Sequence, residues 1–278
     1  TIMFQAGCTT MAAWANAANC AMLAEAFRIH GDEELCAYYT EEAVKAYRYA
    51  EKQEWTQLDD LQNIGTSGMR GRDFKQMAAA FLYNLTGERS WEDVMAQESV
   101  VKDGKSPVFS KQGRNQFYQI WGTAAYLTCP HERHYPELYA NMKSSVNHQA
   151  DENNVNHMYA RPSRRTANDP RWQTSQNLQM VMLAHYIADN SARRSQLENA
   201  MYIEAGWGLG RNPANIVEMT GLGERHIVDC YTTGRNDGTP GSHPGQTPFN
   251  GTETWSAGNG GDARIILGRC YPDWYSGQ

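Results

Sequence analysis

Residues 10–50 read TMAAWANAANCAMLAEAFRIHGDEELCAYYTEEAVKAYRYA, and this stretch contains two helical patterns separated by one short turn. In the first pattern, apolar residues recur every three to four positions, and the pattern stops near Gly31. Asp32 then opens the second pattern as an N-cap residue, with two glutamates in the first turn, where negative charge is favourable. The stretch therefore predicts a helical hairpin.

The same pairing of helical patterns continues to residue 210. Helices are expected at about 73–86, from about 90, at 116–127, at 135–147, from a cap at 168–170 through 188, and at about 193–207. Antiparallel helix pairs with short turns predict an all-α toroid or solenoid, and the periods are too irregular for a tetratricopeptide array. Trp14, Trp121 and Trp207 lie on the apolar positions of these patterns, so we expect them in the core.

The composition changes abruptly after the last helical pattern. Fifteen of the 24 glycines lie between Gly206 and Gly277, together with five of the ten prolines, and no regular element is readable there. Because this region is also rich in Trp and Tyr, it is typical of a functional loop surface, with a flexible tail as the alternative.

Charge and hydropathy exclude two classes of partner. The chain has 278 residues and a formal charge of −6, with no block of Lys and Arg, which argues against binding to nucleic acid or anionic membranes. No stretch approaches about 20 consecutive apolar residues, so no membrane span is expected.

The 8 Trp and 15 Tyr against 7 Phe favour rings with a polar group, which suit sugar-like ligands. Six widely spaced cysteines favour free thiols over disulfides.

Three short motifs late in the chain resemble those of a known family. GLGRNP at 208–213, MTGLG at 219–223 and GSHPG at 241–245 resemble the late part of glycoside hydrolase family 9, the endoglucanase and cellobiohydrolase family. FLYNLTG at 81–87 resembles a helix end of that family more weakly. The resemblance implies an (α/α)6 barrel that is incomplete here. Residues 1–278 would then be one catalytic-domain segment, with helical hairpins at 1–210 and substrate-cleft loops at 211–278.

The resemblance also implies the reaction, which is hydrolysis of β-1,4-glucan (cellulose, mixed-linkage glucan or xyloglucan) with inversion. An inverting enzyme needs two carboxyl groups about 6.5–9.5 Å apart, one to activate water and one to protonate the leaving oxygen. The family's Asp-Ala-Gly-Asp segment and its late Asn-x-Glu acid do not occur in this sequence, so we expect both catalytic carboxylates to lie outside residues 1–278. No catalytic residue is assigned within the chain.

The candidate substrate-binding residues are His243, Arg235, Trp172, Tyr231 and Trp255. His243 matches the family's loop histidine, whose imidazole would hydrogen-bond sugar hydroxyls. The arginine that typically follows is replaced by proline and glycine, so Arg235 is a hypothetical substitute. The three aromatic residues are candidate platforms on which sugar rings stack. For each residue an ordinary structural role is the alternative.

Two alternative functions stay open at this point. The chain could be a non-catalytic glycan-binding toroid, or a polysaccharide lyase that uses Tyr231 or His243 as base with Arg235 neutralising the substrate. No cofactor is expected to be required. The family often binds calcium, but only Asp73 matches its ligands, because Phe74 replaces the glutamate that follows. The expected partner is a β-glucan, and the expected location is extracellular, periplasmic or at the cell surface.

Overall fold

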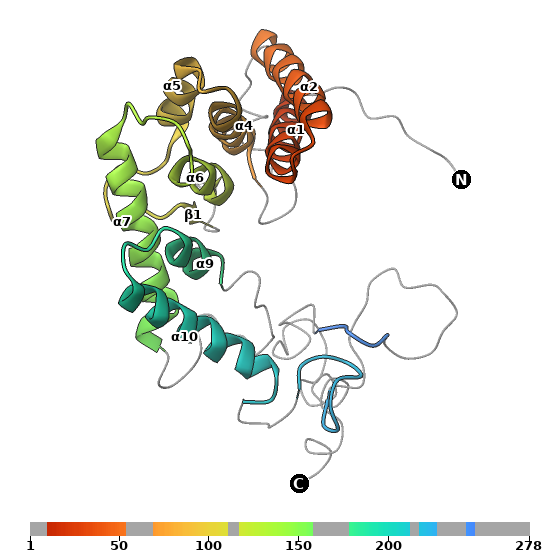
Figure 1. Cartoon of the computed structure of the whole chain (residues 1–278), viewed down its shortest axis with the longest axis vertical. Coiled ribbons are helices and arrows are strands. Elements are labelled where there is room, and N and C mark those ends of the chain that lie inside the picture. Colours follow the sequence, from red (N-terminus) through yellow and green to blue (C-terminus); the bar gives the residue numbers. More distant parts are fainter. Residues whose placement is uncertain are drawn as a thin grey trace, which may run out of the picture. The chain divides into compact units, whose positions relative to one another are not determined.

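The computed structural model describes residues 10–53, 69–110, 117–157, 178–211, 217–226 and 243–247 (Figure 1). The chain divides into two compact units, residues 1–148 and 149–278. The described part of the first unit contains α1 (Thr10–His30), α2 (Glu33–Lys52), α4 (Gly71–Thr86), α5 (Arg89–Glu98), β1 (Phe109–Ser110), β2 (Phe117–Tyr118), α6 (Ile120–Leu127) and most of α7 (Pro136–Asn153). The second contains the end of α7, the 3-10 helix η2 (Val155–His157), α9 (Gln179–Tyr186) and α10 (Ser191–Gly208).

The expected hairpin of residues 10–50 is present as α1 and α2. Asp32 caps α2, since its Oδ1 accepts a hydrogen bond from the Leu35 backbone N–H at 3.0 Å. Gly31 makes the turn with φ +86°, a conformation that favours glycine. On α2, Ala43, Tyr47 and Ala50 are buried, whereas Leu35 near the start of the helix is 37% exposed.

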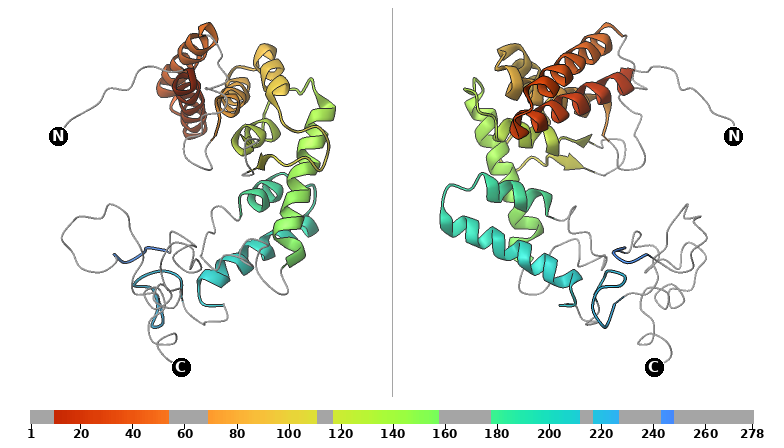
Figure 2. Two further views of the ribbon diagram at one scale, coloured as in Figure 1. Left: turned by 180° about the vertical axis from the view of Figure 1, so that it is seen from behind. Right: turned by 45° about the vertical axis from the view of Figure 1, so that its right-hand side comes forward.

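The first helix of each pair packs against the first helix of the next pair. In the first unit α1 contacts α2 and α4, and α4 contacts α5 and α6. Figures 1 and 2 show α1, α4 and α6 side by side. The core between α1, α2 and α4 is built largely of alanines, whose small side chains allow the helices to approach closely. Trp14 and Tyr47 fill the remaining space with their rings edge to face, 4.5 Å between centroids.

The helices α1, α4 and α6 run in the same direction. Lys75, in the first turns of α4, lies 5.6 Å from the ring of Trp14, in the first turns of α1. The backbone N–H of Tyr118, just before α6, donates to Asp73 Oδ2 in the first turn of α4 at 2.9 Å. The N-terminal ends of the three helices therefore lie at one end of the first unit.

The start of α6 is the main departure from the expected helices. The helix expected from residue 116 begins only at Ile120, because Phe117 and Tyr118 pair as β2 with β1 in an antiparallel register. The side chain of Gln119 ends the strand by bonding to the end of α5, accepting from Val100 N at 2.9 Å and donating to Glu98 O at 2.9 Å. These are tertiary contacts, so helical periodicity alone could not locate this boundary.

The described part of the second unit is a helix pair followed by two short loop segments. Asn190 caps α10 by accepting from the Arg193 N–H at 2.9 Å, and Arg193 also pairs with Asp151 at 2.7 Å. The helix α7 continues to Asn153, six residues beyond the end expected at residue 147. The cap expected at 168–170 lies outside the described residues.

Two sequence expectations about single residues are resolved by exposure. Trp14 is 2% exposed and lies in the core as expected, but Trp121 is 41% exposed, so its assignment to the core was wrong.

The cysteines within the described residues, Cys20, Cys36 and Cys129, are free thiols. No described helix has the length and apolar character needed to cross a membrane.

Candidate functional site

In the first unit, a buried carboxylate ties the starts of α4 and α6 together. Asp73 is 1% exposed, and its Oδ2 accepts backbone N–H bonds from Arg70 at 3.0 Å and from Tyr118 at 2.9 Å. Burial raises the pKa of Asp73, while these hydrogen bonds, the side chain of Gln119 and the charge of Arg70 lower it in part. The carboxyl group thus holds the backbone just before α4 and the backbone just before α6 at one point.

Replacing Asp73 by alanine is expected to lower the free energy of unfolding by about 1–3 kcal/mol, since two buried N–H groups lose their acceptor. Asp73→Asn is the matched control. Its amide oxygen can accept both bonds, and burial already favours the uncharged form of this side chain, so we expect a smaller loss. Urea denaturation followed by circular dichroism measures both. Equal losses for the two variants would contradict the role of the two hydrogen bonds.

The same geometry does not fit a calcium ion at Asp73. The oxygen Oδ2 of this residue is already engaged by two N–H donors, and the next residue in the chain is Phe74 rather than a carboxylate. Calcium takes roughly 6–8 oxygen ligands. Within the described ranges, the structure contains no group of three or more His, Cys, Asp or Glu residues that could hold a metal ion.

Charged side chains flank this end of the first unit. Glu98, the last residue of α5, accepts from Arg72 Nε at 3.0 Å and from Lys75 Nζ at 2.9 Å, both in the first turns of α4. The ammonium group of Lys75 also faces the ring of Trp14. The ends of α4 and α5 are therefore held together by a three-residue ion cluster.

Trp121 is an exposed aromatic residue at this end. It is the second residue of α6, and 41% of its surface is accessible to solvent. It was not among the expected site residues, because it lies on an apolar position of the helix predicted from residue 116 and was therefore expected in the core. A large ring that is partly exposed at the entry of a first helix can stack on the apolar face of a sugar ring.

In the second unit, His243 is exposed and lies in a turn that contacts residues 217–226, the segment after α10. Its backbone N–H donates to Gln246 Oε1 at 3.1 Å, and its carbonyl oxygen accepts from the Thr220 hydroxyl. Two of the motifs singled out in the sequence, at 219–223 and 241–245, thus contact each other. The other candidate residues, Arg235, Trp172, Tyr231 and Trp255, lie outside the described residues.

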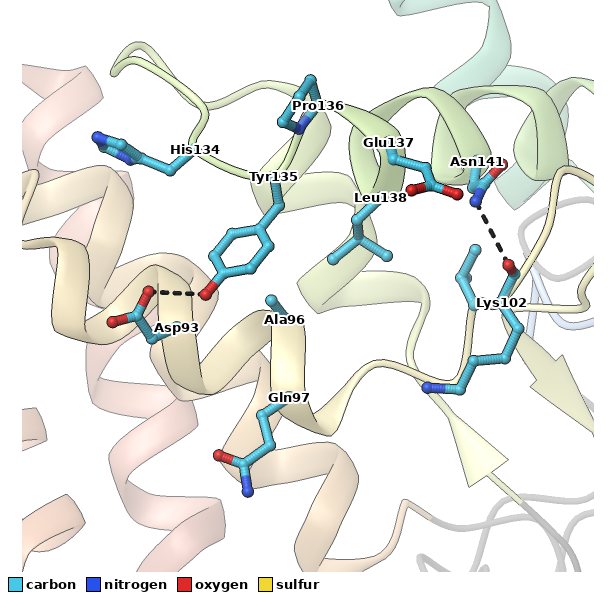
Figure 3. Close-up of a pocket in the computed structure, with 11 residues that line it drawn as sticks. Asp93, Ala96, Gln97, Lys102, His134, Tyr135, Pro136, Glu137, Leu138 and Asn141 are labelled. Atoms are coloured by element: carbon cyan, nitrogen blue, oxygen red, sulfur yellow. Dashed lines mark hydrogen bonds between the residues drawn. The ribbon is translucent and has the colours of Figure 1, made fainter.

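A separate groove of about 830 Å³ lies between α5 and α7 in the first unit (Figure 3). The Tyr135 hydroxyl reaches across it to Asp93 Oδ1 at 2.9 Å, and Asn141 Nδ2 donates to the Lys102 carbonyl at 3.3 Å. Its lining carries charges of both signs.

Comparison with known proteins identifies the family. The model of glycosyl hydrolase family 9 matches residues 2–251, which is most of the chain. The chain belongs to glycosyl hydrolase family 9. The resemblance carried by the three late motifs and by the helix pairs is therefore confirmed.

Solved structures of family 9 proteins share the fold. A metagenome-derived glycoside hydrolase family 9 endoglucanase is similar with a TM-score of 0.58 and 20% identity, over 79% of this chain and 40% of that one. A thermostable endoglucanase variant from Alicyclobacillus acidocaldarius is similar with a TM-score of 0.56 and 18% identity, over 81% of this chain and 42% of that one. A Bacteroides ovatus GH9 protein is similar with a TM-score of 0.57 and 18% identity, over 80% of this chain and 42% of that one. No curated protein sequence matches.

These likenesses confirm the expected all-α fold of an (α/α)6 barrel, of which the chain carries a part. The chain spans about 40% of the length of the family 9 structures that it matches. The family match favours neither the polysaccharide lyase nor the non-catalytic toroid that were kept as alternatives.

Proposed function

We propose that this chain forms part of an inverting family 9 β-1,4-glucanase and supplies substrate-binding surfaces. The observation that carries this proposal is the family match over residues 2–251. The two catalytic carboxylates are proposed to lie outside residues 1–278, because neither family motif that would carry them occurs in the sequence. Acid–base hydrolysis by two carboxyl groups requires no cofactor.

Two described residues have the chemistry for glucan contact. The indole of Trp121 is a flat, partly exposed surface for the apolar face of a glucosyl ring. The imidazole of His243 can donate or accept a hydrogen bond with a sugar hydroxyl. The proposed partner is a β-glucan chain rather than nucleic acid. Such a polymer is found outside the cell, in the periplasm or at the cell surface, and we propose the same location for the protein.

Replacing Trp121 by alanine is expected to weaken cellotetraose binding by the full chain about tenfold, which corresponds to about 1.4 kcal/mol for a lost stacking surface. Isothermal titration calorimetry measures the dissociation constant. Trp121→Phe keeps a ring and should retain most of the affinity. Tyr38→Ala removes a 54% exposed aromatic ring near the start of α2, at the end of the first unit opposite to the start of α6. This variant should bind cellotetraose with the affinity of the wild type.

Activity assays test the catalytic part of the proposal. We expect the chain by itself to release no reducing sugar from carboxymethyl cellulose, because the carboxylate pair is missing from it. Release at a rate above that of a heat-treated control would contradict this. Equal cellotetraose binding by wild type, Trp121→Ala and His243→Ala would contradict the proposed contacts.

A further inference from the structure

Two tight turns meet at the end of the described chain. In the first, Leu222 N donates to Met219 O at 3.4 Å and Gly221 has φ +71°. In the second, residues 243–246 read His-Pro-Gly-Gln, and Gly245 has φ +87°. Proline followed by a glycine of positive φ is typical of a type II turn. Pro244 and Gly245 therefore build the turn that carries His243.

Thr220 joins the two turns through three of its own groups. Its backbone N–H donates to Gln246 O at 2.9 Å, and its carbonyl oxygen accepts from Gly245 N at 2.8 Å. Its hydroxyl accepts from Gln246 N at 3.0 Å and donates to His243 O. The hydroxyl thus bridges the first residue of the turn and the last, the two positions that a β-turn hydrogen bond ordinarily connects. Thr220 is 3% exposed, so its own side of these part-buried bonds is shielded from water.

Thr220 is in turn anchored to α10. Glu218 N donates to Gly208 O, the last residue of the helix, at 2.8 Å, and Val217 forms an antiparallel bridge with Leu209. Val217 N also donates to Arg225 O at 2.9 Å, which closes the loop around the first turn. The position of the His243 backbone is therefore fixed relative to a helix, even though the two segments are distant in sequence.

We propose that Thr220 is the positioning residue for His243, with its hydroxyl inserted in the His243–Gln246 turn so that the imidazole is presented to the glucan in one orientation. The inference rests on the proposed function, in which His243 contacts sugar hydroxyls. Thr220 itself does not touch substrate. Gly221 supports the same contact, because a Cβ there would lie 3.0 Å from Pro244 Cβ and would push the turn away.

Three variants of the full chain test this proposal. Thr220→Val keeps the shape of the side chain but removes the hydroxyl, whereas Thr220→Ser keeps the hydroxyl and is the matched control. His243→Ala removes the residue that is positioned. Amide hydrogen exchange by NMR reports the turn itself. The Gln246 amide, which bonds to the hydroxyl, should exchange about tenfold faster in Thr220→Val and normally in Thr220→Ser. The Gly245 amide, which bonds to a backbone carbonyl, is the internal reference.

Cellotetraose affinity reports the positioning. We expect Thr220→Val to weaken binding about three- to tenfold, the range for one lost neutral hydrogen bond acting on the ligand contact. Thr220→Ser should bind as wild type does. In a His243→Ala background, Thr220→Val should have no further effect, because the two changes act through the same contact.

Three outcomes would overturn the inference. Unchanged Gln246 exchange in Thr220→Val would show that the hydroxyl does not hold the turn. Unchanged affinity in Thr220→Val, where His243→Ala weakens binding, would show that the hydroxyl does not position the imidazole. Additive effects in the double variant would show that Thr220 acts independently of His243. Wild-type affinity in His243→Ala instead contradicts the proposed contact of His243, and the exchange data then judge the Thr220 bridge separately.

Discussion

Replacing Glu92 by alanine is expected to lower the free energy of unfolding by about 3 kcal/mol, the largest effect that we predict for a single polar side chain in this protein. Glu92 lies in α5 with its side chain 0% exposed. Its Oε1 accepts from the Tyr126 hydroxyl at 2.7 Å and from the His134 backbone N–H at 2.8 Å. Its Oε2 lies 2.6 Å from His134 Nδ1. Alanine would leave a buried phenol and a backbone N–H without this acceptor.

The reason for the large effect is that Glu92 fixes a whole connection. Tyr126 is in the last turn of α6 and His134 lies just before α7, so one carboxylate joins both ends of residues 128–135. The phenols around it stay protonated, since burial and then the charge of Glu92 raise the pKa of Tyr83 to about 12. Tyr83 can therefore donate to the Glu132 carbonyl in the same connection.

The adjacent acid is a matched control. Asp93 is 49% exposed, bonds to the Tyr135 hydroxyl and lies 3.7 Å from Arg89 Nε. Surface interactions of this kind contribute roughly 0–1 kcal/mol, so Asp93→Ala should change stability little. Thermal unfolding followed by circular dichroism measures both variants, and about 2–4 °C per kcal/mol is expected for a chain of this size. Equal melting temperatures for Glu92→Ala and Asp93→Ala would refute the buried role of Glu92.

Replacing Gly122 by alanine is expected to destabilise the protein by about 2 kcal/mol, although alanine is the better helix former. Gly122 lies in α6, where a Cβ would come within 1.9 Å of Gln76 Oε1 in α4. Gln76 is 0% exposed, so its side-chain amide can make room for the added methyl group only by moving within the buried α4–α6 contact. Overpacking of this kind typically costs 1–3 kcal/mol, which exceeds the gain in helix propensity.

Three further variants, Gln76→Ala, a double variant and Gly206→Ala, separate overpacking from other causes. The double variant Gly122→Ala with Gln76→Ala removes the clash. Its loss of stability should therefore be smaller than the sum of the losses in the two single variants. Gly206→Ala in α10 is the matched control, because the added Cβ would meet only the flexible side chain of the exposed Arg211, at 3.2 Å. Urea denaturation midpoints measure all four proteins. A Gly122→Ala variant as stable as Gly206→Ala would contradict the close contact.

Local sequence signals predicted the helix boundaries well at two described positions with a cap or a stop residue. The turn at Gly31 and Asp32 and the stop at Gly87, with φ +69°, are where the sequence places them. Such signals act through the residue's own backbone and its nearest neighbours, so they can be read without the fold. The late motifs were sufficient to indicate family 9 for the same reason, since each is a short run of consecutive residues.

The features that the sequence could not supply depend on contacts between distant segments. Trp121 was expected in the core but is 41% exposed, and the start of its helix is set by bonds from Gln119 to α5 and from Tyr118 to Asp73 of α4. Nothing in the spacing of residues 219–223 and 241–246 predicted that one hydroxyl would join them. The sequence by itself thus determined the paired helices and the family, because both are encoded locally. Only the tertiary structure decided which side chains are exposed and which turn holds His243, because these depend on hydrogen bonds and packing between residues far apart in the chain.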